Sequence, residues 1–142
     1  MKSGWDLTPP ERVARLRAAR DFVLGIPDRE FYISHWWLSD GQAFDEERNR
    51  LFRVRDNACG CPVGHMCEKR LFGLSPSTYK NNRERVFVIV GDAFAVPYKL
   101  AEFMFSEYTY PSNIGPPTKE LVARRIEYVA SEMEASIKNS LS

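Results

Sequence analysis

The chain has 142 residues, of which 44% are hydrophobic and 27% charged, so it is long enough for one folded domain and too apolar for a disordered one. Twenty basic residues balance nineteen acidic ones, and the net charge of +1 excludes attraction of nucleic acid or acidic lipid by the molecule as a whole. No apolar run reaches the length of a membrane span, and the N-terminus lacks the apolar segment of a secretory signal. We therefore expect residues 1–142 to form a single globular domain in the cytoplasm.

The first predicted element is a helix over residues 9–24. Thr8 is placed to accept the amide of Glu11, Pro9 suits the first helical position, and Glu11 can return a hydrogen bond to Thr8. Apolar side chains recur every three or four residues until Gly25 provides a stop: Val13, Leu16, Ala19 and Phe22 or Val23. The arginines of this helix do not share one face, which favours a solvated surface over a basic binding face: Arg12, Arg15, Arg17 and Arg20.

Two segments in the next part of the chain predict a small antiparallel β element. Residues 31–38 are rich in aromatic and β-branched side chains, and turn-forming residues follow them at 39–41. Residues 51–55 alternate apolar and basic side chains, as an edge strand with one wet face does. We expect these two segments to pair as a hairpin.

The second half of the chain is predicted to be mostly helical. A helix over residues 62–72 begins at a proline and ends before a glycine, another covers residues 97–106, and Thr118 caps a long helix over residues 118–138. Residues 86–90 are an unbroken apolar run; its β-branching tips the interpretation toward a buried strand, although a buried helix stays open. The sequence therefore predicts an α+β fold, dominated by helices, with a small antiparallel β element.

The chemistry of the chain is concentrated in one segment. All three cysteines and one of the two histidines lie within nine residues: Cys59, Cys61, His65 and Cys67. This Cys3His set would suit tetrahedral zinc, so a zinc-binding domain is one hypothesis, and we expect no other cofactor. In a helix beginning at residue 62, the side chains of His65 and Cys67 would point in directions roughly 200° apart about the helix axis, so they could not coordinate the same ion. We expect the helix to form, with Cys67 packed in the core and no metal bound.

A second hypothesis for this segment is a cysteine enzyme or redox protein. Cys61 would cap the helix and His65 would lie one turn later, so the helix dipole and the imidazole would lower the pKa of the thiol. Cys61 would then be the catalytic nucleophile and His65 its base. A Cys59–Cys61 disulfide would close a strained ring and act as a redox switch. The simpler interpretation makes Cys61 a cap and His65 a packed or surface residue, because no oxyanion motif accompanies them.

The same segment carries a resemblance. Cys59-Gly60 followed by Cys61-Pro62-Val63-Gly64 resembles a segment of small uncharacterised bacterial and bacteriophage proteins, which reads Cys-Gly, a few residues, then Cys-x-x-Gly and small or apolar residues. Residues 121–129 resemble their terminal helix. In this chain the two halves abut, and His65 stands where those proteins have an apolar or small residue. The resemblance implies a packed cysteine helix and a mobile-element origin, and it implies no activity.

Aromatic residues support the leading hypothesis, a non-catalytic accessory or protein-interaction module whose partner is another protein. Adjacent Trp36 and Trp37 would point to opposite faces of a strand, which leaves one of them available to a partner. Tyr108 and Tyr110 belong to a loop over residues 108–117 whose Tyr, Ser, Asn and Gly content is typical of protein-contact surfaces.

An exposed tryptophan beside basic residues would also suit single-stranded nucleic acid. The near-neutral net charge makes nucleic acid the less favoured partner. The basic residues considered for such a patch are Arg53, Arg55, Lys69 and Arg70.

Overall fold

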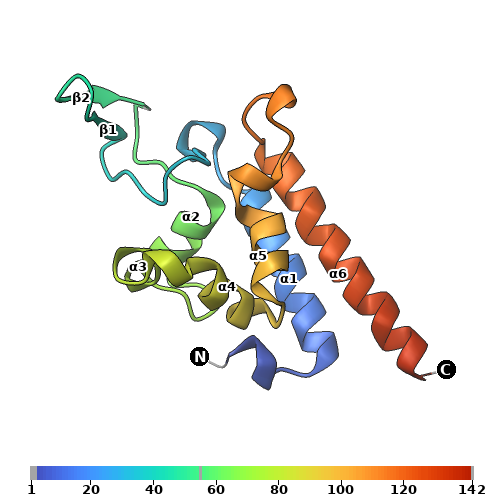
Figure 1. Ribbon diagram of the computed structural model, residues 1–142. Coiled ribbons are helices and arrows are strands. Elements are labelled where there is room, and N and C mark those ends of the chain that lie inside the picture. Colours follow the sequence, from blue (N-terminus) through green and yellow to red (C-terminus); the bar gives the residue numbers. More distant parts are fainter. Residues whose placement is uncertain (1–2, 55, 142) are drawn as a thin grey trace.

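The structure, a computed structural model, describes residues 3–54 and 56–141 (Figure 1). It is a single α+β domain dominated by helices, as the sequence predicts. The helices are α1 (Pro9–Leu24), α2 (Pro62–Glu68), α3 (Pro76–Lys80), α4 (Val86–Phe94), α5 (Tyr98–Phe105) and α6 (Lys119–Leu141). The strands are β1 (Gln42–Asp45) and β2 (Arg50–Arg53). Short 3-10 turns join them: η1 (Gly4–Asp6), η2 (Asp28–Glu30), η3 (Arg83–Arg85), η4 (Glu107–Thr109) and η5 (Ser112–Ile114).

Helix α1 has the predicted bounds. The Thr8 hydroxyl accepts the Glu11 amide at 3.3 Å, and a Glu11 carboxylate oxygen accepts the Thr8 amide at 2.8 Å, so the capping box forms in full. Its buried residues all belong to the predicted stripe, in which Phe22 is only partly buried: Val13, Leu16, Ala19 and Val23. Both bounds and buried face of this helix are therefore confirmed.

The longest helix, α6, runs antiparallel to α1 along its length (Figure 1). Arg17 joins the two helices by pairing with Glu127 at 3.0 Å and with Glu134 at 2.9 Å, and Arg20 also pairs with Glu127. These bonds, from Arg17 above all, lower the pKa of Glu127 from 4.5 to about 2. Two of the arginines expected to be solvated therefore hold the helix pair together.

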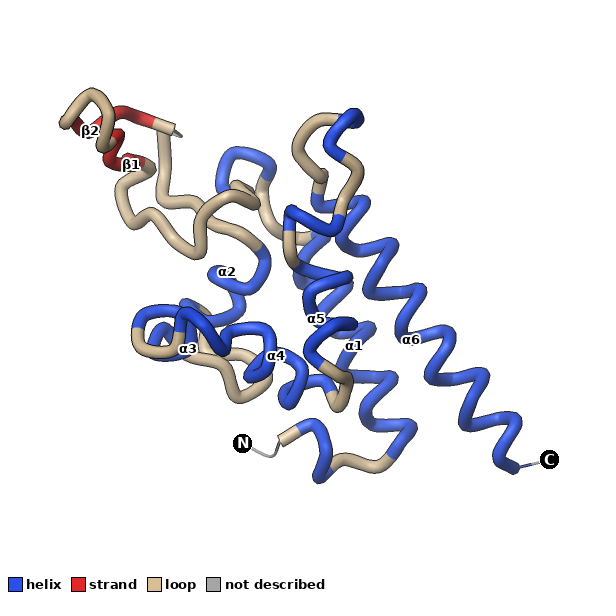
Figure 2. The backbone as a smooth tube through the Cα atoms, in the orientation of Figure 1, coloured by secondary structure: helices blue, strands red, loops and turns tan. Residues whose placement is uncertain are grey.

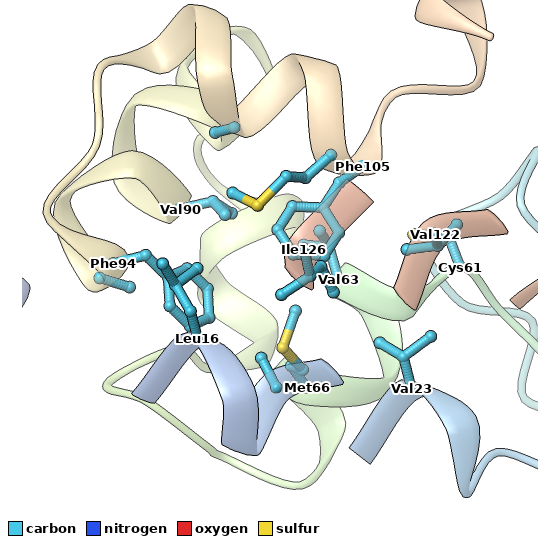
Figure 3. Packing of buried hydrophobic residues seen from close by; sticks show 14 of the residues in the cluster. Leu16, Val23, Cys61, Val63, Met66, Val90, Phe94, Phe105, Val122 and Ile126 are labelled. Carbon is cyan, nitrogen blue, oxygen red and sulfur yellow. The ribbon is translucent and has the colours of Figure 1, made fainter. Parts of the chain in front are cut away.

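Helices α2, α4 and α5 complete the core against α1 and α6, as the packed side chains of Figure 3 show. The strand interpretation of residues 86–90 is wrong, because this run opens α4. Its buried residues recur at helical spacing: Val86, Val90, Gly91, Ala93 and Phe94. No neighbouring strand is present among residues 3–54 and 56–141 to pair with the run, so packing overrides the β propensity of its valines.

The expected hairpin forms with a different first strand: β2 covers residues 51–53 of the expected second segment, but its partner is β1 in place of residues 31–38. β1 pairs with β2 in antiparallel register, with Phe44 opposite Leu51, and position 55 of the expected strand lies outside the described residues. Residues 31–38 form no strand; their backbone groups instead bond to residues 59–61, and only isolated bridges result. The turn residues expected to close a strand at 39–41 in fact lead into β1. Loop covers most of this part of the chain in Figure 2.

Three helices differ slightly from expectation at their ends, and the smallest difference is in α5, which runs from Tyr98 to Phe105 where residues 97–106 were predicted. α2 ends at Glu68 rather than 72, because Arg70 and Phe72 adopt the left-handed conformation, with φ of 54° and 57°, which breaks the helical repeat. α6 begins after Thr118, whose hydroxyl accepts the Leu121 amide at 3.2 Å, and it continues to Leu141. Across the described ranges, no helix has both the length and the apolar character needed to cross a membrane.

Candidate functional site

The cysteine segment forms the start of α2. Cys61 is the N-cap, its sulfur accepts the Gly64 amide at 3.4 Å, and Pro62 occupies the first helical position. Every residue from 62 to 67 is buried. Cys61 lies within the packed cluster of Figure 3, which includes Val63 and Met66 from the same helix. The predicted cap is confirmed, and it lies in the interior of the protein.

Two glycines of this segment allow another part of the chain to cross it closely. A Cβ atom added to Gly64 would lie 1.4 Å from the carbonyl oxygen of Trp36, and one added to Gly60 would lie 2.3 Å from the same oxygen. The crossing is held by hydrogen bonds from the Cys61 amide to the His35 carbonyl at 2.8 Å and from the Leu38 amide to the Cys59 carbonyl at 2.7 Å. The Cys-Gly and Cys-x-x-Gly pattern thus leaves room for the Trp36 backbone.

Burial makes the Cys61 thiol a poor nucleophile. The side chain is in the core, and desolvation raises its pKa from 9.0 to about 12, although hydrogen bonds from the Gly64 and Val63 amides act in the opposite direction. The amides at the helix terminus lower this pKa as expected, but burial outweighs them, so the net shift is upward. Because the thiolate is the reactive form, the geometry gives no support to Cys61 as a catalytic nucleophile.

The His65 ring is engaged in packing. Its Nε2–H donates to the Glu30 carbonyl at 2.6 Å, and Trp37 meets the ring edge-on with centroids 4.9 Å apart. Burial lowers the pKa of His65, which keeps the imidazole neutral. The His65 ring therefore links α2 to Glu30 in η2. This agrees with the simpler interpretation, in which His65 is a packed residue.

The remaining thiols, those of Cys59 and Cys67, are also buried. Desolvation raises the pKa of Cys67 to about 11, and its side chain belongs to the core cluster, as predicted. The predicted Cys59–Cys61 disulfide is not formed. Within residues 3–54 and 56–141, no group of three or more His, Cys, Asp or Glu side chains is placed to hold a metal ion, and the proposed zinc ligands do not converge.

The structure brings Trp36 and Tyr108 together at the surface. They line one hollow of about 350 Å³, here called the aromatic pocket. Its wall comes from three parts of the chain: Ile33, Ser34, His35 and Trp36; Arg83 and Phe87; and Phe105, Ser106, Glu107 and Tyr108. The Trp36 ring rests on Phe87, with centroids 5.8 Å apart. Two residues predicted to meet a partner therefore share one site.

A second hollow of about 420 Å³, here called the proline pocket, adjoins the first. The two share Ser34, Glu107 and Tyr108 in their walls, and the proline pocket continues over Pro111, Pro116 and Pro117. Tyr108 is 90% exposed at the boundary between them. We refer to the two hollows together as the contact groove.

The base of η4, which carries Tyr108, is firmly held. The Arg125 guanidinium donates to the Phe103 carbonyl at 2.7 Å and to the Thr109 hydroxyl and carbonyl at 2.9 and 3.1 Å. It also lies over the Tyr110 ring, 3.6 Å from the centroid. An exposed tyrosine on a restrained turn can meet a partner with little loss of backbone freedom.

Trp37 and Tyr110 serve mainly as support. Trp37 lines neither hollow and packs against His65. Tyr110 forms part of the proline pocket wall but is only 7% exposed, and its hydroxyl donates to the Met104 carbonyl at 2.7 Å. Burial raises the Tyr110 pKa. Of the four aromatic residues predicted to bind a partner, Trp36 and Tyr108 have the position to do so directly.

Sequence reasoning missed Arg83, Phe87 and Glu107. Arg83 and Phe87 come from η3 and the first turn of α4, and no sequence spacing relates them to Trp36. The described residues of the basic patch considered above do not line the aromatic pocket: Arg53, Lys69 and Arg70. Arg55 lies outside the described residues.

No protein-family model matches the chain, and no curated protein or solved structure matches it. The resemblance to bacterial and bacteriophage proteins therefore stays a prediction.

Proposed function

We propose that this protein is a non-catalytic, cytoplasmic interaction module that binds a partner protein through the contact groove. The observation that carries the proposal is the position of Trp36 and Tyr108 on one pocket, with Tyr108 90% exposed on a restrained turn. Tryptophan and tyrosine dominate the binding energy of protein interfaces because they bury much area at a small entropic cost. A tyrosine this exposed has no packing role inside its own chain.

The shape of the site favours a peptide segment over an enclosed small molecule. The aromatic and proline pockets adjoin and share the Tyr108 wall, so an occupant can extend from one into the other. Aromatic and proline side chains form most of the apolar surface there, which is typical of grooves that hold an extended peptide. A cysteine enzyme is not favoured, because burial raises the Cys61 pKa to about 12.

Site-specific photo-crosslinking tests the proposal. A benzophenone amino acid is placed at position 108 and, in a control, at position 98, where another exposed tyrosine lies outside the groove. A discrete protein adduct from position 108 alone, identified by mass spectrometry and competed by unlabelled protein, is the expected result. Tyr108→Ala competitor should lose this ability while Tyr98→Ala competitor keeps it. Equal adducts from both positions, or none from position 108, would contradict the proposal.

A further inference from the structure

The aromatic pocket holds an arginine without a partner of its own. Arg83 is exposed in η3, lines the pocket, and has no ion pair or hydrogen bond within residues 3–54 and 56–141. By contrast, Arg17, Arg20 and Arg125 are all engaged in bonds to carboxylates or carbonyls. A guanidinium at a concave surface is suited to a carboxylate, which it can bind through two parallel hydrogen bonds.

The negative group in the same pocket leaves Arg83 available. Glu107 also lines the aromatic pocket, but its carboxylate accepts the Ser34 hydroxyl at 3.0 Å and makes no ion pair with Arg83. The pocket therefore presents the Arg83 guanidinium, which has no carboxylate partner among the described residues, and the Glu107 carboxylate, which already accepts one hydrogen bond. A ligand that places a carboxylate at Arg83 and N–H donors toward Glu107 matches both groups, as an acidic peptide does.

Apolar side chains share the aromatic pocket with Arg83. Trp36, Phe87 and Phe105 form walls of the aromatic pocket beside Arg83. The volume of about 350 Å³ is near the lower end of the range of about 300–1,000 Å³ usual for ligand pockets. A short segment with one acidic group and one neighbouring apolar side chain therefore suits the pocket better than a long polar one.

From these observations we infer that the aromatic pocket binds a carboxylate of the partner, either an Asp or Glu side chain or the chain terminus, with an apolar side chain next to it. Arg83 pairs with the carboxylate, and Trp36 and Phe87 contact the apolar side chain. This inference rests on the proposed function, since it names the chemistry of the segment that the contact groove receives.

Synthetic octapeptides in matched sets provide the test. Each set contains an amidated peptide with Glu beside Leu or Phe, the same peptide with Gln in place of Glu, and the Gln peptide with a free terminal carboxylate. Binding is measured by fluorescence anisotropy for the wild type, R83Q and R85Q. Arg85 is the matched control, because it is exposed in the same turn but does not line the aromatic pocket.

The wild type should prefer at least one carboxylate peptide to its neutral counterpart by about tenfold, as expected for a charged hydrogen bond. R83Q should abolish this preference and R85Q should keep it, and the favoured peptide identifies a side-chain or terminal carboxylate. Equal binding of acidic and neutral peptides, no binding of either, or a preference that survives R83Q would overturn the inference. If peptides bind without charge preference and Y108A abolishes that binding, only the carboxylate assignment fails and the proposed function stands.

Discussion

Replacing Gly64 with alanine tests the close crossing at the start of α2. The added Cβ would lie 1.4 Å from the Trp36 carbonyl oxygen, whereas ordinary van der Waals contact begins at 3.4 Å. The two backbones must therefore separate by about 2 Å, because neither side of the contact is a flexible side chain. The Trp36 backbone lies between the bonds that join His35 to Cys61 and Leu38 to Cys59, so the separation strains both.

The magnitude follows from these two effects. Overpacking a tight core costs about 1–3 kcal/mol, and each weakened backbone hydrogen bond adds about 1 kcal/mol. We expect Gly64→Ala to lower the free energy of unfolding by at least about 3 kcal/mol, a large share of the ~5–15 kcal/mol typical of a domain. The Trp36 side chain should also shift away from the aromatic pocket.

Urea unfolding followed by tryptophan fluorescence measures the change. The control is Gly25→Ala, where the added Cβ would lie 3.5 Å from the Asp21 and Phe22 carbonyl oxygens and φ is −81°, a conformation open to alanine. This control should be more stable than the wild type by about 0.4–1 kcal/mol, because alanine restricts the unfolded chain. A Gly64→Ala protein that is as stable as the wild type would refute the steric clash at the crossing.

Two further predictions concern ionisable groups. The thiols of the folded protein should resist a disulfide reagent at pH 8 and react once the protein is unfolded. The rise of the Cys61 pKa from 9.0 to about 12 lowers the thiolate fraction of this residue by roughly a thousandfold. Rapid labelling of Cys61 in the folded protein would contradict its burial as a helix cap. The Glu127 pKa falls from 4.5 to about 2, mainly through Arg17, so the folded state gains stability above pH 4.5 and loses it as the pH falls toward 2. As the pH is lowered from 4.5 toward 2, the urea midpoint of Glu127→Gln should therefore fall less steeply than that of the wild type. If the two midpoints fall in parallel with pH, the Glu127 carboxylate is not a source of stability.

The sequence was sufficient to predict those features that depend on interactions between near neighbours in the chain. The Thr8–Glu11 capping box and the spacing of apolar residues predicted the bounds of α1, and Cys61 was correctly placed as a cap. These features depend on contacts within one turn of helix. The helix-dominated α+β class followed from them.

Long-range packing explains the features that were missed. Residues 31–38 have strand-like composition, but their backbone bonds are taken by residues 59–61, which are distant in sequence. The valines of α4 adopt a helix because the surrounding helices cover them. Arg83 and Trp36 line the same pocket although they are distant in sequence, and no sequence periodicity predicts that they lie together.

The Arg125 bonds couple the exposed site to the longest helix. Arg125 belongs to α6, which is joined to α1 by Arg17, and the same guanidinium holds the turn that carries Tyr108. Under the proposed function, a partner bound at Tyr108 would therefore also stabilise α6 against local opening. Slower amide exchange in α6 on addition of the partner would be the sign of this linkage.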